Sequence, residues 1–264
     1  MNKFQVIAHR GASAISPENT IIAFKRAIEI GADAIETDVQ MTKDGHLVLI
    51  HDEQLGRTTN GTGWVKDLTL EEIKQLDAGS WFSAAYGGET IPTLDEFFHL
   101  ISPTSLWVNI EIKDGFILYP GIEEALVEKI KEYHLQERVL ISSFNHYSIV
   151  KIKKLAPDFK TAVLYLEGLY QPWDYARNLG ATALHPEKNV IFPEVVRAAH
   201  QAGMKIYPFT VDEKKEMRRI IAMGADGIMT NVPDRLILLL RELEKEEEEV
   251  SLSGNSIKKT ITRK

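Results

Sequence analysis

Apolar and polar positions alternate along this chain with two different periods. Short, nearly continuous apolar runs are separated by longer stretches in which apolar residues recur every three or four positions. The short runs predict buried strands, and the longer stretches predict amphipathic helices. The predicted strands are Gln5–His9, Ala34–Val39, Leu106–Lys113, Val139–Phe144, Thr161–Tyr165, Ala181–His185, Lys205–Val211 and Gly227–Thr230.

Helical stretches separate most of these strands. They cover Glu18–Ile30, Ile122–His134, His146–Ala156, Trp173–Leu179, Pro193–Ala202, Glu213–Met223 and Pro233–Glu247. A strand followed by a helix, repeated in this way, is typical of a parallel sheet with helices outside it. The number of repeats predicts an α/β fold of the closed (β/α)8 type, a TIM barrel. An open doubly wound sheet is the alternative, but the glycine-rich nucleotide-binding sequence it often carries is missing.

Helix-capping residues agree with this division. Ser16, followed by Pro17, is the predicted N-cap of the first helix. Thr69 and Thr93 each precede a glutamate by three positions, which is the spacing of a capping box. Four glycines just before predicted strands are expected to end helices in the left-handed conformation: Gly31, Gly180, Gly203 and Gly224.

One long stretch interrupts the alternation between His51 and Leu106. The sequence "TKDGHLVLIHD" predicts a turn at Asp44-Gly45 and a strand running to His51, and "DLTLEEIKQLDAGSW" predicts a short helix. We therefore expect an insertion of about residues 52–104 in one βα loop, on the rim where barrel enzymes assemble their sites. Its aromatic side chains either wall that site or, as we expect for most, form a small core of the insertion: Trp64, Trp81, Phe82 and Tyr86.

The ends of the chain define the expected domain. Residues 1–247 are predicted to form a single TIM-barrel domain, and the polar residues 248–264 predict a solvated, partly disordered tail. The opening "MNKFQVIAHRG" lacks the apolar stretch of a secretory signal. No apolar run is long enough to span a bilayer. We expect a cytoplasmic protein, and the sequence leaves its oligomeric state open.

Charge and cysteine content exclude several classes of function. Lysine and arginine number 31 and aspartate and glutamate 38, a net charge of −7, which disfavours non-specific nucleic-acid binding. No basic amphipathic stretch suggests a membrane surface. The chain has no cysteine, so disulfides and thiol catalysis are excluded. The expected partner is a small molecule.

Two similar sequences point to a special role for two carboxylates. "GADAIETDV" (31–39) and "GADGIMTNV" (224–232) share most of their residues, so we expect one structural solution used twice. The first copy has Glu36 and Asp38 where the second has Met229 and Asn231. The framework therefore does not require carboxylates there. Glu36 and Asp38 are two apart, so in a strand they point to the same side.

The strand "LWVNIEIK" supplies a second pair at the same spacing, Glu111 and Lys113. If Glu111 reaches the same barrel mouth, three carboxylates converge. Oxygen ligands without histidine or cysteine suit one divalent cation, Mg²⁺ or Ca²⁺, better than zinc. The alternative is an internal ion-pair network with Arg10 and Lys113.

Two histidines also end predicted strands. His9 ends the first strand and His51 ends "LVLIHD". A bound cation with open positions, two imidazoles, an arginine and a lysine would form a good receptor for a phosphate ester, with one imidazole as general base and the other as general acid. His185, which ends "ALH", is expected to line the pocket at most.

These motifs resemble a known family. "HRGASAISPENT", "ETDVQMTKDGHLVLIHD", "IPTLDEFF" and "VNIEIK" together resemble the glycerophosphodiester phosphodiesterase family, and the resemblance runs from His9 to about Asp234. It implies a (β/α)8 barrel with a small insertion after His51. It also implies hydrolysis of glycerophosphodiesters, such as glycerophosphocholine or glycerophosphoethanolamine, to glycerol 3-phosphate and an alcohol.

The resemblance assigns a role to each candidate residue. His9 and His51 match the family's acid/base pair, and Arg10 and Lys113 match its phosphate-binding residues. The matching metal ligands are Glu36, Asp38 and Glu111. Glu18 and Asn19 belong to the motif but look like first-turn residues that shape the loop.

One departure and three alternatives remain. Many members have Trp-Thr-Val-Asn where this chain has Phe209–Asp212, which affects the expected pocket wall rather than the chemistry. A lysophospholipase D of the same family would need an apolar groove at the rim. Another metal-dependent barrel enzyme would not need both histidines, and a non-catalytic phosphate-binding barrel would have no use for this full set of charges.

Overall fold

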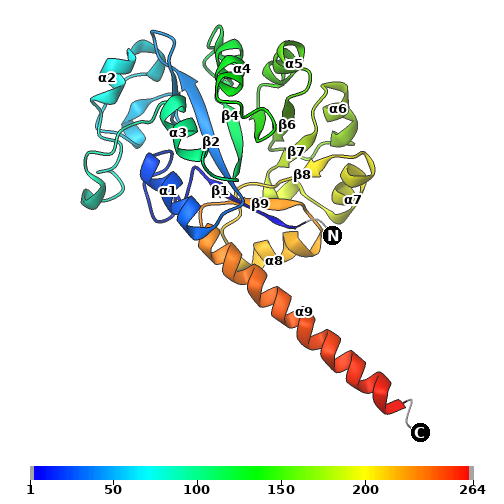
Figure 1. Ribbon diagram of the computed structural model, residues 1–264. Helices are drawn as coiled ribbons and strands as arrows, with labels where there is room; N and C mark the ends of the chain where they lie inside the picture. Colours follow the sequence, from blue (N-terminus) through cyan, green and yellow to red (C-terminus); the bar gives the residue numbers. More distant parts are fainter. Residues whose placement is uncertain (1–2, 262–264) are drawn as a thin grey trace.

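The fold is a barrel of parallel strands surrounded by helices. The computed structural model describes residues 3–261, and Figure 1 shows helices wrapped around the sheet. The sheet order is β8-β7-β6-β5-β4-β2-β1-β9, with every neighbouring pair parallel. The barrel strands are β1 (Gln5–His9), β2 (Ala34–Met41), β4 (Trp107–Ile112), β5 (Val139–Ser143), β6 (Lys160–Tyr165), β7 (Ala183–Pro186), β8 (Lys205–Ile206) and β9 (Gly227–Thr230). The predicted (β/α)8 architecture is confirmed.

Helices cover the outside of the barrel in chain order, and one short helix, α2, lies in the insertion. They are α1 (Ile21–Ile30), α2 (Leu70–Lys74), α3 (Leu94–Ile101), α4 (Ile122–Glu132), α5 (His146–Leu155), α6 (Pro172–Asn178), α7 (Pro193–Gln201), α8 (Lys214–Ala222) and α9 (Pro233–Ile261). The main hydrophobic core lies between these helices and the strands. A smaller apolar cluster, which includes Ile7, Leu140 and Met229, fills the barrel interior beneath the candidate site.

The barrel closes between β8 and β9 through residues beyond the short strand β8. Tyr207 and Phe209 donate backbone hydrogen bonds to Leu184 and Pro186, and Val211 donates one to Met229. Pro208 has no N–H group, and this interrupts regular pairing in the middle of the run. The strand expected over Lys205–Val211 is therefore assigned only to Lys205–Ile206, although its path continues alongside β9.

The insertion is shorter than the expected residues 52–104. Helix α3 buries Leu94, Phe97, Phe98 and Ile101 in the main core, so it is a barrel helix and not part of the insertion. The preceding segment has its own small core, which includes Val48, Leu55, Val65 and Ile73. The short strand β3 (Leu47–Leu49), helix α2 and three 3-10 turns lie in this region: Leu55–Arg57, Val65–Asp67 and Ala84–Tyr86. None of the four aromatic side chains belongs to that cluster, but Trp81, Phe82 and Tyr86 pack edge to face on one another outside it.

The capping predictions are confirmed except at the first helix. Thr69 and Thr93 both form complete capping boxes. All four predicted glycines have left-handed backbone conformations. Helix α1, however, begins at Ile21 with Thr20 as its N-cap, because Asn19 has a φ of 55° that no helical residue can adopt. The Ser16 N-cap is therefore wrong, and the four residues that follow it form part of the loop after β1.

The two similar sequences form strands that flank β1 on either side. In both, a left-handed glycine ends the helix, at Gly31 and Gly224. Two residues further on, Asp33 and Asp226 each accept a hydrogen bond from a backbone N–H of the neighbouring strand, at 2.9 Å in both cases. The expectation of one structural solution used twice is confirmed.

Helix α9 is longer than expected. It runs from Pro233 to Ile261 and extends away from the barrel (Figure 1). Residues 248–261, where the sequence predicts a solvated, partly disordered tail, continue this helix, and no proline after Pro233 interrupts it. Residues 262–264 of the chain lie outside the described part. Within residues 3–261, no helix combines the length and the apolar character needed to cross a bilayer.

Candidate active site

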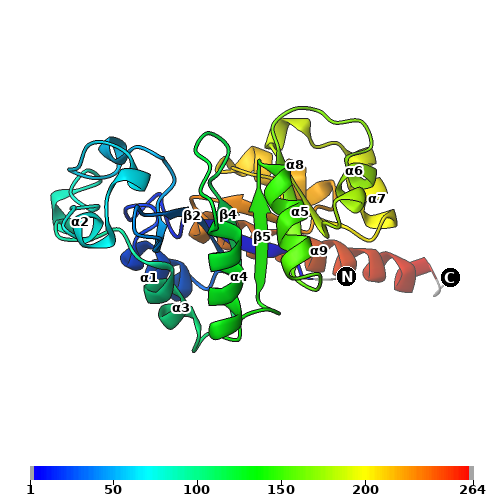
Figure 2. The same ribbon diagram turned by 90° about the horizontal axis from the view of Figure 1, so that it is seen from above.

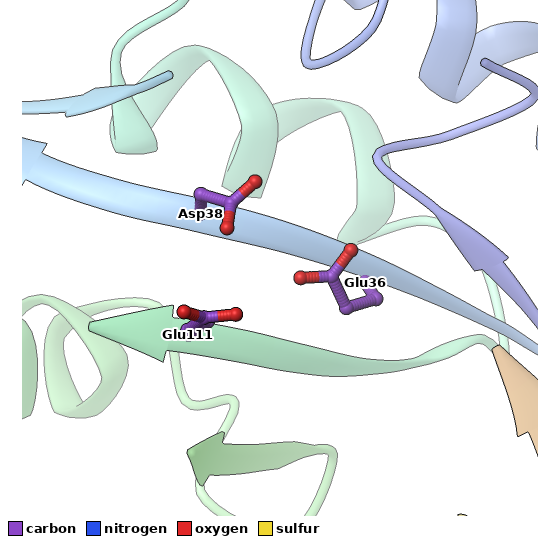
Figure 3. A group of neighbouring side chains, drawn as sticks. All are labelled: Glu36, Asp38 and Glu111. Atoms are coloured by element: carbon purple, nitrogen blue, oxygen red, sulfur yellow. The ribbon is translucent and has the colours of Figure 1, made fainter. Parts of the chain in front are cut away.

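Three carboxylates meet at the mouth of the barrel. Glu36 and Asp38 point to the same side of β2, as their spacing predicts, and strand pairing places Glu111 of β4 directly beside Asp38. One oxygen from each carboxylate lies within 4.8 Å of the others, and all three residues are buried. Figure 3 shows the two side chains of β2 facing Glu111 across the pair of strands.

Each carboxylate is held by a hydrogen bond from the protein. The Arg10 backbone N–H donates to Glu36 Oε2 at 3.0 Å, and Asn19 Nδ2 donates to Asp38 Oδ2 at 2.9 Å. Lys113 Nζ donates to Glu111 Oε1 at 2.9 Å. Asp38 Oδ1 is buried and has no hydrogen-bond partner among the described residues. An orphaned carboxylate oxygen facing two other carboxylates matches the ligand set of a hard divalent cation.

The pKa values of the three carboxylates show that the neighbouring cationic side chains do not fully offset their negative charges. Burial, followed by repulsion from Asp38, raises the pKa of Glu36 well above its usual value and that of Glu111 to about 7. Burial would raise the pKa of Asp38 as well, but Arg10, His51 and Lys113 lower it below its usual range. A cation bound here would lower these raised pKa values and compete with protons for Glu36 and Glu111.

His9 lies at the edge of the carboxylate cluster. Its Nε2 is 3.9 Å from Glu36 Oε2, and its Nδ1 is 2.7 Å from Asn231 Oδ1. Burial and the neighbouring charge of Arg10 lower its pKa to about 4. His9 is therefore neutral near pH 7, with one ring nitrogen bonded to Asn231 and the other facing the carboxylates.

His51 reaches the same mouth through the turn at Asp44-Gly45 and the strand after it, both of which the sequence predicts. Strand β3 pairs antiparallel with β2, so the chain turns back, and Ile50 donates to the Asp38 carbonyl oxygen at 3.1 Å. His51 therefore lies on a return segment beside the site and does not end a barrel strand. Its Nε2 is 3.2 Å from Lys113 Nζ, and its Nδ1 is 2.6 Å from Asp52 Oδ1.

A buried amide fixes the backbone of His51. Gln40 Nε2 donates to the carbonyl oxygens of Ile50 and His51, at 3.1 and 3.0 Å. Gln40 Oε1 in turn accepts a hydrogen bond from Tyr119, at 2.7 Å, in the loop after β4. Three elements are thereby tied together, which limits the movement of His51 relative to the carboxylates.

A chain of ion pairs joins the two sides of the site. Glu18 bonds to Arg10 Nη1 at 2.8 Å and to both terminal nitrogens of Arg57, at 2.9 and 2.8 Å. Arg57 also bonds to Asp52, the partner of His51, through Nε at 2.6 Å and Nη2 at 3.0 Å. Arg10 and His51 are therefore linked through three residues of the loop after β1 and the insertion.

The loop after β1 is shaped by its backbone. Arg10 has a φ of 55°, a left-handed conformation that costs about 1–3 kcal/mol outside glycine and is found at functional sites. At Gly11, with a φ of 82°, a Cβ atom would lie 2.6 Å from the backbone carbon of Ala23. Only glycine permits the loop to pack this closely against α1.

Sequence reasoning missed several residues of this site. Glu18 and Asn19 contact the charged groups directly and are not first-turn helix residues. Asp212, noted only as a departure in the pocket wall, accepts from Asn231 Nδ2 at 2.7 Å. Asp52 could have been suspected because it directly follows His51, whereas no sequence signal pointed to Arg57. His185 is fully buried, with its ring 5.8 Å from that of Tyr207, and does not line the mouth.

A cavity of about 600 Å³ opens onto the site, within the range of small-molecule pockets. Its polar end is formed by His51, Glu111 and Lys113. The remaining wall comes from Glu53 after His51, from Ile112 at the end of β4, and from the loops after β4, β5 and β6. A substrate can therefore reach the cluster from one side of the barrel mouth.

Comparison with known proteins places this arrangement in a family. Residues 9–235 match the model of the glycerophosphoryl diester phosphodiesterase family. The chain is 58% identical over 240 residues to a glycerophosphodiester phosphodiesterase of Caldanaerobacter subterraneus subsp. tengcongensis, covering 91% of this chain and 99% of that protein. A second glycerophosphodiester phosphodiesterase, from Bacillus altitudinis, is 44% identical over 91% of this chain and 99% of its own length.

Solved structures agree. A phosphodiesterase of Oleispira antarctica, in complex with the product sn-glycerol-3-phosphate, superposes with a TM-score of 0.82 at 32% identity, over 90% of this chain and 96% of that one. The family match covers nearly the same residues as the resemblance seen in the sequence. The chain therefore belongs to the glycerophosphoryl diester phosphodiesterase family.

Proposed function

We propose that this protein hydrolyses glycerophosphodiesters to sn-glycerol 3-phosphate and an alcohol with the help of one divalent cation, Mg²⁺ or Ca²⁺. One observation carries the proposal. Three buried carboxylates lie within 4.8 Å of one another and are bordered by Arg10, Lys113 and two histidines. The relative bound to sn-glycerol-3-phosphate supports the choice of substrate.

The three carboxylates would hold the cation. Glu36, Asp38 and Glu111 offer oxygen ligands only, and Asp38 Oδ1 has no other partner among the described residues. A cation bound there would polarise the phosphoryl group and stabilise the charge that develops on its oxygens. Its binding would compete with protons for Glu36 and Glu111, whose pKa values are raised.

Arg10 and Lys113 would bind the phosphoryl oxygens. Arg10 uses Nη1 for Glu18, and no partner of its Nη2 is found within residues 3–261. Burial disfavours its charge, but Asp38 and Glu18 hold its pKa above the usual value, so the guanidinium stays ionised. Lys113 stands between Glu111 and His51 and can turn toward a phosphate without leaving the site.

His9 and His51 would transfer the protons. One imidazole removes a proton from the attacking hydroxyl, which belongs either to water or to the glycerol 2-position, and the other protonates the departing alkoxide. Attack by the 2-hydroxyl would give a cyclic phosphate that water then opens. Each histidine has a side-chain partner on Nδ1, so both rings are held with Nε2 toward the carboxylates or Lys113.

The test is release of glycerol 3-phosphate from glycerophosphocholine. Activity should disappear after chelation and return with Mg²⁺ or Ca²⁺ added separately, which also identifies the working ion. His9→Ala and His51→Ala should abolish turnover while the protein remains folded. Near wild-type activity in either variant would exclude that histidine from proton transfer, and activity unaffected by chelation would exclude the cation.

A further inference from the structure

Exposed apolar side chains gather on the loops at the barrel mouth. Phe116 and Leu118 follow β4, Tyr147 follows β5, and Leu166 and Tyr170 follow β6. Phe116 is 92% exposed and Tyr170 is 89% exposed. Figure 2 shows the loop after β4 standing above the ends of the strands. Large apolar groups concentrated around a site, rather than scattered over the surface, indicate a surface that binds an apolar partner.

Three of these side chains, Phe116, Leu166 and Tyr170, border a path that begins at the carboxylates. The cavity of about 600 Å³ has His51, Glu111 and Lys113 at one end, and Phe116, Phe144 and Leu166 along its wall. Leu166 also lines a second cavity of about 430 Å³. Its wall is mainly aliphatic and aromatic, and the other lining residues are Leu169, Tyr165, Tyr170, Tyr175, His146 and Glu167. Leu166 therefore belongs to the walls of both cavities. An apolar path thus leads from the candidate metal site over the rim formed by the loop after β6.

We propose that this path binds an apolar chain carried by the alcohol of the diester substrate, an inference that rests on the proposed function. The glycerol hydroxyls need hydrogen-bond partners, which leucine and phenylalanine side chains do not offer. A short charged head group would fill only the first cavity and would leave the second one empty. A flexible alkyl chain fits both cavities and gains from burial along their length.

The reaction at phosphorus is unchanged by this substituent. The P–O bond to the alcohol breaks, a P–O bond to the oxygen of water forms, and the departing oxygen takes a proton. The products are sn-glycerol 3-phosphate and a long-chain alcohol. Because the chain is bound equally in the ground state and the transition state, the gain should appear as a lower KM.

A series of alkyl esters tests the inference. The ethyl, butyl, hexyl and octyl esters of sn-glycerol 3-phosphate all release the same product and stay monomeric at assay concentrations. For the wild-type protein we expect kcat/KM to rise by up to about fourfold for each methylene buried. Leu166→Ser and Phe116→Ser should flatten this series, with the octyl ester losing most and the ethyl ester least. Leu118→Ser is the matched control, since Leu118 is 73% exposed in the same loop as Phe116 but lines neither cavity.

The outcomes separate the two proposals. A flat series in the wild-type protein, with the ethyl ester hydrolysed, would overturn the apolar path and leave the proposed function intact. The apolar path would also be overturned if Leu166→Ser reduced turnover of glycerophosphocholine as much as that of the octyl ester, because the cavity would then hold the head group itself. Failure to hydrolyse any member with either cation would count against the proposed function.

Discussion

The side-chain oxygen of Asn231 lies 2.7 Å from His9 Nδ1 and determines which nitrogen of that ring carries the proton. Asp212 Oδ2 accepts from Asn231 Nδ2 at 2.7 Å, and Asp212 Oδ1 accepts from the Asn231 backbone N–H at 2.8 Å. A carboxylate only accepts, so the amide must present nitrogen to Asp212 and oxygen to His9. His9 Nδ1 is therefore the donor, and Nε2 keeps its lone pair toward Glu36.

Removing the carboxylate of Asp212 should change the tautomer and orientation of His9 without removing a contact to the substrate. In Asp212→Ala the amide of Asn231 can turn over, and the ring of His9 then loses its fixed tautomer. We expect kcat to fall by about 10- to 100-fold, the usual cost of removing an orienting partner in a metal site, while KM changes little. Steady-state kinetics and the ¹⁵N chemical shifts of the His9 ring provide the two measurements.

Asp212→Asn is the matched control, because its side-chain oxygen can still accept from Asn231 Nδ2. It should retain most of the activity and the wild-type tautomer. A slower Asp212→Ala enzyme with unchanged ¹⁵N shifts would mean that Asp212 acts only on the packing of the barrel mouth and not through His9.

The architecture was predictable because its signals are local. Buried runs such as Val139–Ser143 and left-handed glycines such as Gly31 depend on a few neighbouring residues. The extent of the insertion was not predictable in this way. Helix α3 has a strongly apolar face, and only its packing against β-strands and α1 distinguishes it from a helix of the insertion. Its neighbours are far away in the sequence.

The candidate site was predictable where strand periodicity governs it. Glu36 and Asp38 share one side because strands alternate, and Glu111 joins them through the pairing of β2 with β4. The repeated sequence also held an unused signal, because it places Asn231 at the position equivalent to Asp38. The role of Arg57 could not be predicted from the sequence, because its contacts with Glu18 and Asp52 depend on how the insertion folds over the loop after β1.

Without a cation, repulsion among the three carboxylates should destabilise the folded protein. Removing one of these charges should therefore not lower its stability. The pKa of Glu36 is raised in the folded state, so its contribution to stability is present below its unfolded pKa and is lost as the pH rises. In Glu36→Gln the amide oxygen can still accept from the Arg10 backbone N–H. At pH 8 without cation we expect this variant to have an equal or higher Tm than the wild-type protein, and to lose the cation-induced rise in Tm.

Glu123→Gln is the control for that measurement. Glu123 is also buried, on α4, but it bonds to Ser148 and Lys151, away from the cluster. Its replacement should leave the cation-induced rise in Tm intact. A full rise in Glu36→Gln would remove Glu36 from the set of ligands.

Arg57 should act as a positioning residue for His51. Arg57→Ala removes the fork that holds Asp52 and Glu18 together, so Asp52 can leave His51 Nδ1. We expect kcat/KM to fall by about tenfold or more, as for other orienting partners, with a small change in Tm because Arg57 is 43% exposed on its side chain. Arg57→Lys should not restore activity, since an ammonium group cannot bridge both carboxylates as the planar fork does.

The companion variant is Lys66→Ala, which removes an exposed ion pair with Asp67 in the same insertion. It should behave as wild type in both assays. Equal activity in Arg57→Ala and Lys66→Ala would show that the ion-pair chain does not govern His51.

His185 should make the protein sensitive to acid. Burial lowers its pKa to about 3, and neither ring nitrogen has a hydrogen-bond partner among the described residues. Because the folded pKa lies below the unfolded value near 6.5, the folded state excludes a proton that the unfolded state takes up. Stability from this group is therefore complete above pH 6.5 and falls by about 1.4 kcal/mol for each pH unit between 6.5 and 3.

His185→Met replaces the ring with an apolar side chain and removes this linkage. Its Tm at pH 7 should stay close to that of the wild-type protein, since no hydrogen bond is lost. Between pH 7 and pH 5 the wild-type Tm should fall by about 4–8 °C more than that of the variant, from roughly 2 kcal/mol of linkage in a barrel of this size.

His9, Glu36 and Glu111 titrate in both proteins, so the difference between the two profiles isolates His185. His46→Met, at an exposed position in the turn between β2 and β3, should follow the wild-type profile. Parallel profiles for wild type and His185→Met would mean that the buried ring takes up a proton without unfolding the barrel.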